Sequence, residues 1–272
     1  MYPQIQFLGL TFGTYGLLAV IGCLTCAFIF CFQLTKRKLS VNDGILFIVA
    51  VVVGVFLGGH LLFGITNIRY FHYLFERVDF SIWLGRFSVI FGGAVFYGGL
   101  YGGLATGALA IKILRLDAKV YVGLFTPMIP LFHAFGRVGC FFAGCCYGIE
   151  SDFGFAATEN AFVPDVVGVT RFPIQLLEAA LNILLFVFLF LLYRRQQKKK
   201  SVLDGGLFYL YLVIYGVIRF FDEFLRGDAK RGFLGPLSTS QWISIIGICL
   251  GSILLYRTIR KNKNATNDAV AT

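Results

Sequence analysis

Apolar residues run in long blocks along the chain, and short polar segments separate the blocks. Seven blocks are close to or above the about 20 apolar residues that one helical membrane crossing needs: residues 7–34, 44–65, 88–111, 120–140, 173–193, 203–222 and 239–257. Lipid offers no partner for backbone hydrogen bonds, which favours helices for blocks of this length. The pattern therefore predicts an all-α integral membrane protein with about seven transmembrane helices, forming a single polytopic membrane domain over residues 1–272.

Basic residues indicate how these helices are oriented. Lysines and arginines gather in every second connection, within residues 36–38, 112–119, 194–200 and 257–263. Cytoplasmic loops carry an excess of such residues. Seven crossings then place the N-terminus outside and the C-terminus in the cytoplasm, with outer-face loops at about 66–87, 141–172 and 223–238.

Composition agrees with a membrane location. Hydrophobic residues make up 58% of the chain and charged residues 14%, against about 25% charged in soluble domains. The net charge of +10 is then mainly an orientation signal that also attracts anionic lipid. Binding of nucleic acid would need a basic face on a soluble surface, and the sequence predicts none.

The basic residues outside the four cytoplasmic clusters are of a different kind. Eight of these nine are arginine: Arg69, Arg77, Arg86, Arg137, Arg171, Arg219, Arg226 and Arg231, with Lys230 the exception. The planar guanidinium matches phosphate and carboxylate groups bidentately, which lysine does not. Salt bridges in outer loops would explain some of them. A charge near hydrocarbon is costly, so Arg137 and Arg219 point to the binding of a phospholipid headgroup.

Polar residues inside the predicted spans recur at helical spacing. Three stripes follow from this spacing: His133, Arg137 and Cys140; Gln175, Glu178 and Asn182; and Arg219, Glu223 and Arg226. The last stripe is either an ordinary intrahelical ion pair or a carboxylate that holds an arginine in place for a phosphate. A glutamate at the depth of Glu178 is either neutral or paired with arginine.

Glycines dominate the third predicted span. Gly98 and Gly102 are four residues apart, as are Gly99, Gly103 and Gly107. Such spacing creates a flat helix face for close packing. The alternative is that the backbone near Gly98 and Gly99 approaches a ligand, with the Tyr97 hydroxyl directed into the site.

Three of the seven cysteines lie close together in the sequence, at Cys140, Cys145 and Cys146. Zinc sites commonly use two separated pairs of ligands, and this spacing fits that arrangement poorly. A disulfide at the outer face, or free thiols lining a site, is the better interpretation. We therefore expect no metal and no cofactor.

Five segments, in this order, resemble the motifs of the prolipoprotein diacylglyceryl transferase family, which are integral membrane enzymes of bacteria. The resemblance covers most of the chain and rests on Gly13–Leu17, Phe96–Gly102, Gly136–Gly148, Arg171–Glu178 and Tyr215–Arg226.

The resemblance implies transfer of the diacylglyceryl group of phosphatidylglycerol to the lipobox cysteine thiol of a preprolipoprotein, at the bacterial cytoplasmic membrane. It implies catalytic roles for Arg137, Arg219 and Glu223, with Tyr97 at the position of the family's histidine. It implies substrate-binding roles for Tyr15, Gly98, Gly99, Gly139, Cys140, Gly144, Gly148, Gln175, Glu178 and Arg226.

The sequence departs from the family pattern at two of these positions. Tyr97 replaces a histidine, and a phenol is a weaker base than imidazole at neutral pH; His133 is the alternative base. Cys140 replaces an asparagine. These departures leave open a paralogue that uses the same lipid donor with another acceptor. They also leave open a reaction in which an enzyme thiol, Cys140 or Cys145, takes the diacylglyceryl group first. They also leave open a phospholipid-binding or transport protein without catalytic activity.

Overall fold

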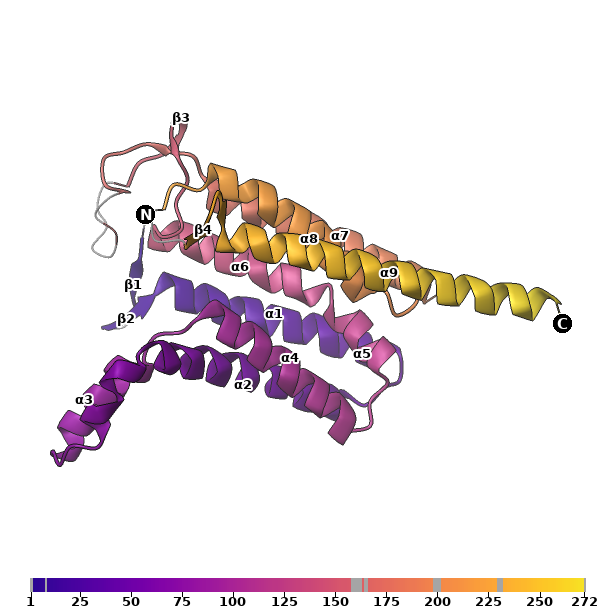
Figure 1. Cartoon of the computed structure of the whole chain (residues 1–272), viewed down its shortest axis with the longest axis horizontal. Helices are drawn as coiled ribbons and strands as arrows, with labels where there is room; N and C mark the ends of the chain where they lie inside the picture. Colours follow the sequence, from indigo (N-terminus) through magenta and orange to yellow (C-terminus); the bar gives the residue numbers. More distant parts are fainter. Residues whose placement is uncertain are drawn as a thin grey trace. The chain divides into compact units, whose positions relative to one another are not determined.

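The computed structural model describes residues 2–7, 9–157, 163, 166–197, 202–228 and 232–271. The predicted basic residues Lys198, Lys199, Lys200, Lys230 and Arg231 lie outside these ranges. The chain divides into two compact units, and helices dominate both (Figure 1). The first unit comprises residues 1–30 and 119–272, and the second comprises residues 31–118.

The first unit is built on consecutive helices that run side by side. They are α6 (Met128–Ala143), α7 (Ile174–Gln196), α8 (Leu207–Asp222) and α9 (Thr239–Ala271). Each packs against the next along the chain (Figure 1). The first part of α1 (Thr14–Lys36), as far as Phe30, also belongs to this unit. Phe30 is fully buried and its ring packs against that of Tyr121, with centroids 6.2 Å apart.

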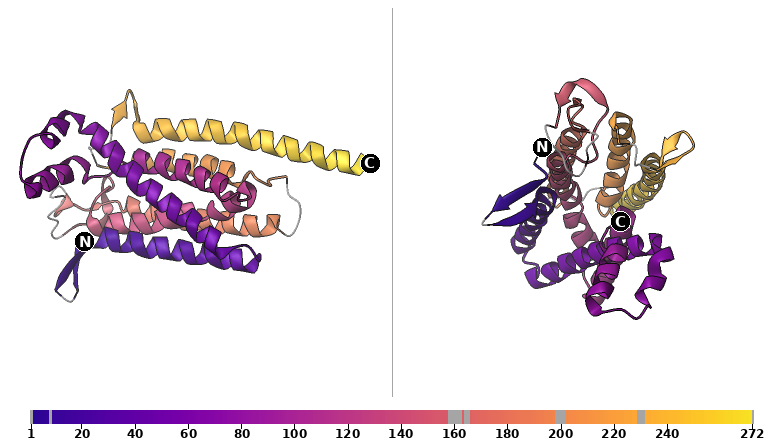
Figure 2. Two further views of the ribbon diagram at one scale, coloured as in Figure 1. Left: turned by 90° about the horizontal axis from the view of Figure 1, so that it is seen from below. Right: turned by 90° about the vertical axis from the view of Figure 1, so that its left-hand side faces the viewer.

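The chain enters α1 through a β-hairpin. β1 (Gln4–Phe7) pairs antiparallel with β2 (Leu10–Gly13), so that Gln4 lies opposite Gly13 (Figure 2). Gly9 in the turn has a φ of +78°, a value that glycine adopts without steric cost. The helix therefore starts at Thr14, and the first residues of the predicted span 7–34 form part of the hairpin.

Two predicted spans are interrupted. Residues 120–140 are divided between α5 (Ala118–Phe125) and α6, because Pro127 at the junction has no N–H for a helical hydrogen bond. Residues 88–111 are divided between α3 (Phe80–Phe91) and α4 (Phe96–Ile113). Gly92 and Gly93 lie at this second break, where glycine lowers the stability of a continuous helix.

In the second unit, α2 (Val41–Thr66) packs closely along α4. A Cβ atom on Gly98 would overlap the carbonyl oxygen of Gly58, and one on Gly102 would overlap that of Gly54. The absence of side chains therefore lets the two backbones meet. The prediction that Gly98 and Gly102 form a packing face is confirmed.

Short elements fill the predicted outer loops. Residues 66–87 contain η1 (Ile68–Leu74) and the start of α3. Residues 141–172 contain β3 (Glu150–Phe155). Residues 223–238 contain η3 (Glu223–Leu225) and the pair β4 (Phe233–Leu234) and β5 (Leu237–Ser238).

Five helical segments within the described residues are long and apolar enough to cross a membrane: Thr14–Lys36, Val41–Thr66, Ala118–Ala143, Ile174–Gln196 and Thr239–Ala265. Two further predicted spans correspond to shorter helices, α4 with 18 residues and α8 with 16. Many large apolar side chains on these helices are exposed, as expected for surfaces that face lipid. The protein is a mainly helical, multi-pass membrane protein.

Candidate active site

Polar and charged side chains of the first unit collect at one end of its helices. Successive helices are joined by connections that reverse the chain direction (Figures 1 and 2). The C-terminal ends of α6 and α8 therefore lie at the same end as the N-terminal ends of α7 and α9. This arrangement brings together Arg137, Glu178, Arg219 and Ser240, which are far apart in the sequence.

Glu178 lies at the centre of this group. Its side chain is about 3% exposed, and it forms ion pairs with Nε of Arg137 and with Nη1 of Arg219, the latter at 3.3 Å. An ionised carboxylate so deeply buried is stable only when it is paired. The sequence left a neutral or a paired Glu178 open, and the structure shows the paired form.

The two arginines differ in how much of each guanidinium the protein uses. Nη2 of Arg219 bonds the Ser240 hydroxyl at 3.1 Å and pairs with Glu223 at 2.6 Å, while its Nη1 pairs with Glu178. Arg137 contacts its carboxylate through Nε alone, and neither Nη atom has a hydrogen-bond or ion-pair partner among the described residues. Its side chain remains 11% exposed. Arg137 thus has a free pair of donors at the end of a membrane helix.

The prediction that Arg219, Glu223 and Arg226 form one helical stripe is wrong at its third position. Helix α8 ends at Asp222, and Arg226 is extended with φ −83° and ψ 139°. It is extended because its neighbours pair with the loop after α6: Ile149 donates to the carbonyl of Leu225 at 3.0 Å. Arg226 forms a two-point ion pair with Asp228, at 2.9 and 2.6 Å.

Gly148 is needed where this loop meets two other segments. A Cβ atom there would overlap the carbonyl oxygen of Phe172 and lie 3.1 Å from that of Leu225. Gly148 also bridges to Arg226. Arg171 stacks on the Tyr147 ring, with 4.5 Å between its Cζ atom and the ring centroid. The glycine of the predicted signature therefore permits a close approach of three backbone segments.

Other predicted residues shape the same loop. Gly144 ends α6 with a φ of +71°, a left-handed conformation that suits glycine at a helix C-terminus. Gln175 at the start of α7 donates through Nε2 to the carbonyl of Cys145 at 2.9 Å. Gly139 packs against Tyr15, since a Cβ atom would lie 3.0 Å from the Tyr15 ring. The Gln175 contact fixes the loop between α6 and α7, and the Gly139 contact packs α6 against the start of α1.

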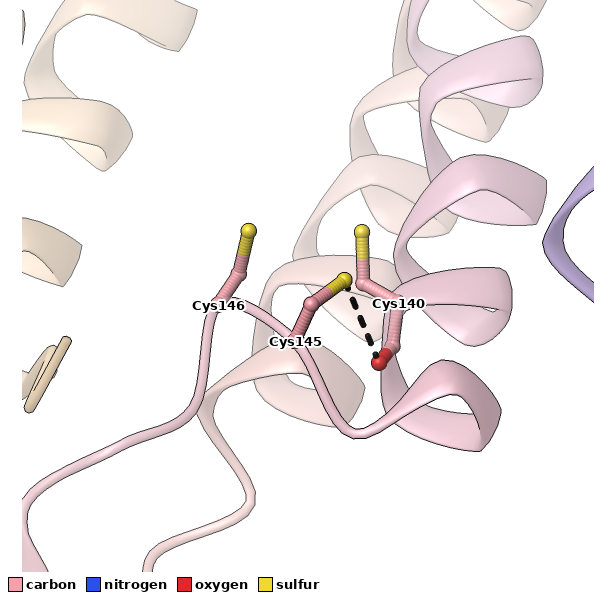
Figure 3. A group of neighbouring side chains, drawn as sticks. All are labelled: Cys140, Cys145 and Cys146. Carbon is pink, nitrogen blue, oxygen red and sulfur yellow. Dashed lines mark hydrogen bonds between the residues drawn. The ribbon is translucent and has the colours of Figure 1, made fainter. Parts of the chain in front are cut away.

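All seven cysteines of the chain are free thiols. Cys140, Cys145 and Cys146 have their sulfur atoms within 4.8 Å of one another (Figure 3). The pKa of the Cys146 thiol is lowered by hydrogen bonds from Cys140 and Cys145 and, to a smaller extent, by Arg226 and Arg137. Of the two interpretations of the sequence, the structure shows free thiols beside Arg137.

His133 lies one turn before Arg137 on α6, and Tyr215 lies one turn before Arg219 on α8. Their rings are 5.3 Å apart between centroids, and Tyr215 stacks on Tyr211 at 5.5 Å. His133 is within electrostatic range of both Arg137 and Arg219. Tyr97, Gly98 and Gly99 lie on α4 in the second unit.

Sequence reasoning missed two members of the group. Asp228 pairs with Arg226, and Ser240 bonds Arg219. The polar run Ser238–Gln241 at the start of the last apolar block was the signal for Ser240. No periodic signal pointed to Asp228, because Arg226 and Asp228 meet in a loop.

The fold and this group of residues define a class: a multi-pass membrane protein with buried arginines, one of them with donors free for an anionic group. The pattern of the family described as prolipoprotein diacylglyceryl transferase matches residues 3–257. The chain is 34% identical over 250 residues to the phosphatidylglycerol–prolipoprotein diacylglyceryl transferase of Clostridium tetani, covering 90% of this chain and 93% of that protein.

Two further relatives carry the same description. The second such transferase of Clostridium perfringens is 36% identical over 260 residues, covering 92% of each chain. The transferase of Hydrogenovibrio crunogenus is 30% identical over 278 residues, covering 96% of this chain and 97% of that protein. The chain belongs to the prolipoprotein diacylglyceryl transferase family.

Proposed function

We propose that this protein transfers the diacylglyceryl group of phosphatidylglycerol to the lipobox cysteine thiol of a preprolipoprotein. Family membership over residues 3–257 supports this reaction, as do the names of relatives at 30–36% identity. The observation that carries the proposal is the free pair of Nη donors on Arg137, beside a carboxylate that fixes its orientation. The geometry of this planar pair matches the oxygens of a phosphodiester.

In the proposed reaction, the sulfur of the acceptor cysteine attacks the glyceryl carbon that carries the phosphate. The carbon–oxygen bond to phosphate breaks, a thioether forms, and glycerol phosphate leaves. Negative charge grows on the departing phosphate, and Arg137 stabilises it there. Arg219 and Glu223 act through Glu178, because their contacts hold that carboxylate and hence the Arg137 side chain.

The proton of the acceptor thiol needs a base. Two residues are proposed for this role, Tyr97 on α4 and His133 on α6. Comparison of Tyr97→Phe with His133→Gln assigns the base, since only loss of the true base lowers the rate without changing phosphatidylglycerol binding.

The substrate-binding set extends from Arg137 over the loop after α6. Gly144 and Gly148 shape that loop, Gln175 holds it, and Gly139 on α6 packs against Tyr15. Gly98 and Gly99 on α4, Cys140, Glu178 and Arg226 complete the set.

Orientation follows from charge. We propose seven crossings, with α4 and α8 added to the five longer segments, in the bacterial cytoplasmic membrane. Arg194 and Arg195 end α7, at the opposite end of the first unit from Arg137. Since positive loops stay in the cytoplasm, the site lies at the outer end, the N-terminus is outside and the C-terminus is inside.

The test is a direct assay of both products. Purified protein is mixed with phosphatidylglycerol in detergent micelles and a lipobox peptide; released glycerol phosphate and the mass of the peptide are measured. We expect both, and we expect Arg137→Ala to abolish both. Arg195 is an exposed arginine at the far end of α7, so Arg195→Ala is the matched control and keeps activity.

Other outcomes separate the alternatives. Glycerol phosphate without a modified peptide selects a paralogue with a different acceptor, which the replacements at Tyr97 and Cys140 favour. A diacylglyceryl mass on Cys140 or Cys145 would show that an enzyme thiol takes the group first. If no anionic phospholipid yields glycerol phosphate, the proposed enzymatic activity is contradicted. A phospholipid-binding or transport function then remains.

A further inference from the structure

The three-thiol cluster is defined as Cys140, Cys145 and Cys146. The proposed reaction gives Cys140 a place in the substrate-binding set, but it does not use the three thiols as a cluster. Its sulfur atoms all lie within 4.8 Å of one another. The Cys145 Sγ points to the Cys140 carbonyl at 3.8 Å, and the three thiols come from the last turn of α6 and the segment that follows it (Figure 3). Cys140 is buried and the other two are partly buried.

The backbone explains how a poor sequence spacing gives a compact cluster. Gly144 has a φ of +71° and Cys146 a φ of +55°. Two left-handed residues so close together turn the chain back on the end of α6. The Cys145 amide then donates to the Cys140 carbonyl at 3.1 Å, and Gln175 holds the Cys145 carbonyl. The expectation of no metal site rested on the spacing of the three cysteines in the sequence. The turn brings their sulfur atoms together in spite of that spacing.

Cys146 is the position where this conformation is least expected. A residue with a Cβ atom adopts positive φ only at a steric cost, and such residues cluster at functional sites. A glycine there would adopt the turn without that cost but would supply no sulfur. Cys146 adopts this strained backbone conformation and supplies the third sulfur of the cluster.

The dimensions suit a thiophilic metal ion. Thiolate sulfurs lie about 2.3 Å from zinc, so that ligands in a tetrahedral set are about 3.8 Å apart. Sulfurs within 4.8 Å of one another reach that separation by side-chain rotation, without movement of the helix.

The surrounding charge also suits such an ion. Three thiolates and one divalent cation carry a net charge of −1, which is costly to bury alone. Arg137 and Arg226 both lie within electrostatic range of Cys146. These two guanidinium groups also pair with Glu178 and Asp228, and their positive charge beside the sulfurs lowers the cost of an anionic metal–thiolate group. Soft thiolate ligands select Zn²⁺ or Cu⁺ over oxygen-seeking cations.

We propose that Cys140, Cys145 and Cys146 bind one thiophilic metal ion, Zn²⁺ or Cu⁺, through three sulfur ligands beside Arg137. Binding replaces three S–H bonds by three metal–sulfur bonds and releases three protons to solvent, with no change in oxidation state. The site does not depend on the proposed transfer reaction, because its test needs neither lipid substrate nor acceptor peptide.

The test uses the full-length protein in detergent, reduced and kept free of oxygen. One arm titrates Zn²⁺ and the other Cu⁺, each against a chromogenic chelator of known affinity. We expect one equivalent per chain, with the tighter arm identifying the ion. Cys140→Ser, Cys145→Ser and Cys146→Ser should each weaken binding at least about 100-fold, more than the about 10–100-fold cost of losing an outer-shell partner. Cys249→Ser, an exposed thiol outside the cluster, should bind as the unmodified chain does.

A second measurement on the unmodified chain guards against variants that fail to fold. Thiol alkylation is followed peptide by peptide with mass spectrometry, with and without the bound ion. The ion should slow alkylation of the cluster at least tenfold and leave Cys249 unchanged. Absence of binding in both arms, binding that survives all three substitutions, or equal alkylation with and without the ion would each overturn the proposal.

Discussion

Replacement of Glu178 by glutamine removes the charge that two buried arginines share. Glutamine keeps the size of the side chain but carries no charge. It therefore cannot form the ion pairs with Nε of Arg137 and Nη1 of Arg219. Arg219 keeps Glu223 at 2.6 Å, whereas Arg137 loses its only ion pair among the described residues. Two guanidinium groups then face one another across a neutral amide. We expect Glu178→Gln to destabilise the fold strongly.

The expected cost follows from burial. Glu178 is about 3% exposed and both arginine side chains are 11% exposed. Removal of one partner from a buried pair costs about 3–5 kcal/mol, because an uncompensated charge stays buried. At about 2–4 °C per kcal/mol for a chain of this size, the apparent melting temperature falls by about 6–20 °C.

The matched control is Glu150→Gln. Glu150 also pairs with an arginine at 3.3 Å, Arg171, but its side chain is 72% exposed. An exposed pair contributes less than about 1 kcal/mol. Both variants are heated in detergent, and the fraction that stays monodisperse is measured by size-exclusion chromatography. Equal shifts for the two variants would show that Glu178 is not the buried partner of the arginines, and the account of the site would fail.

Two further substitutions test parts of the same site. Arg137→Lys keeps the charge but loses the planar pair of Nη donors, so the release of glycerol phosphate should fall about 10²-fold. Arg195→Lys is the control and should not change this release. Equal activity of the two variants would mean that a point charge suffices at position 137. Gly148→Ala places a Cβ atom against the Phe172 carbonyl and should destabilise the chain by about 1–3 kcal/mol. Gly136→Ala, which has open space at the Cβ position, should be neutral or slightly stabilising by thermal unfolding, and a neutral result at both glycines would contradict the close approach.

Local patterns predicted most of the helices. Block length and hydropathy placed α2, α7 and the start of α9 within a few residues of their observed bounds. They did not place the hairpin before Thr14 or the breaks at Pro127 and at Gly92. Hydropathy measures only how apolar a block is, and it does not register a single residue whose backbone interrupts a helix.

The sequence predicted most residues of the site but not which of them form ion pairs with one another. Helical spacing placed Gln175, Glu178 and Asn182 on one buried face of α7. Helical spacing between α8 and η3 predicted the Arg219–Glu223 pair, which the structure shows. It did not predict that Glu178 reaches across to two other helices, nor that Arg226 leaves the helix and pairs with Asp228.

The sequence alone determined the class of this protein. Apolar blocks long enough to span lipid, and arginines placed where hydrocarbon makes charge costly, are properties of composition and spacing. Only the tertiary structure decided which donors are free and which thiols meet. Those outcomes depend on where helices end and how loops turn back, at Asp222, Gly144 and Cys146. A turn of one or two residues has no periodicity, and the contacts it creates join residues that no local pattern relates.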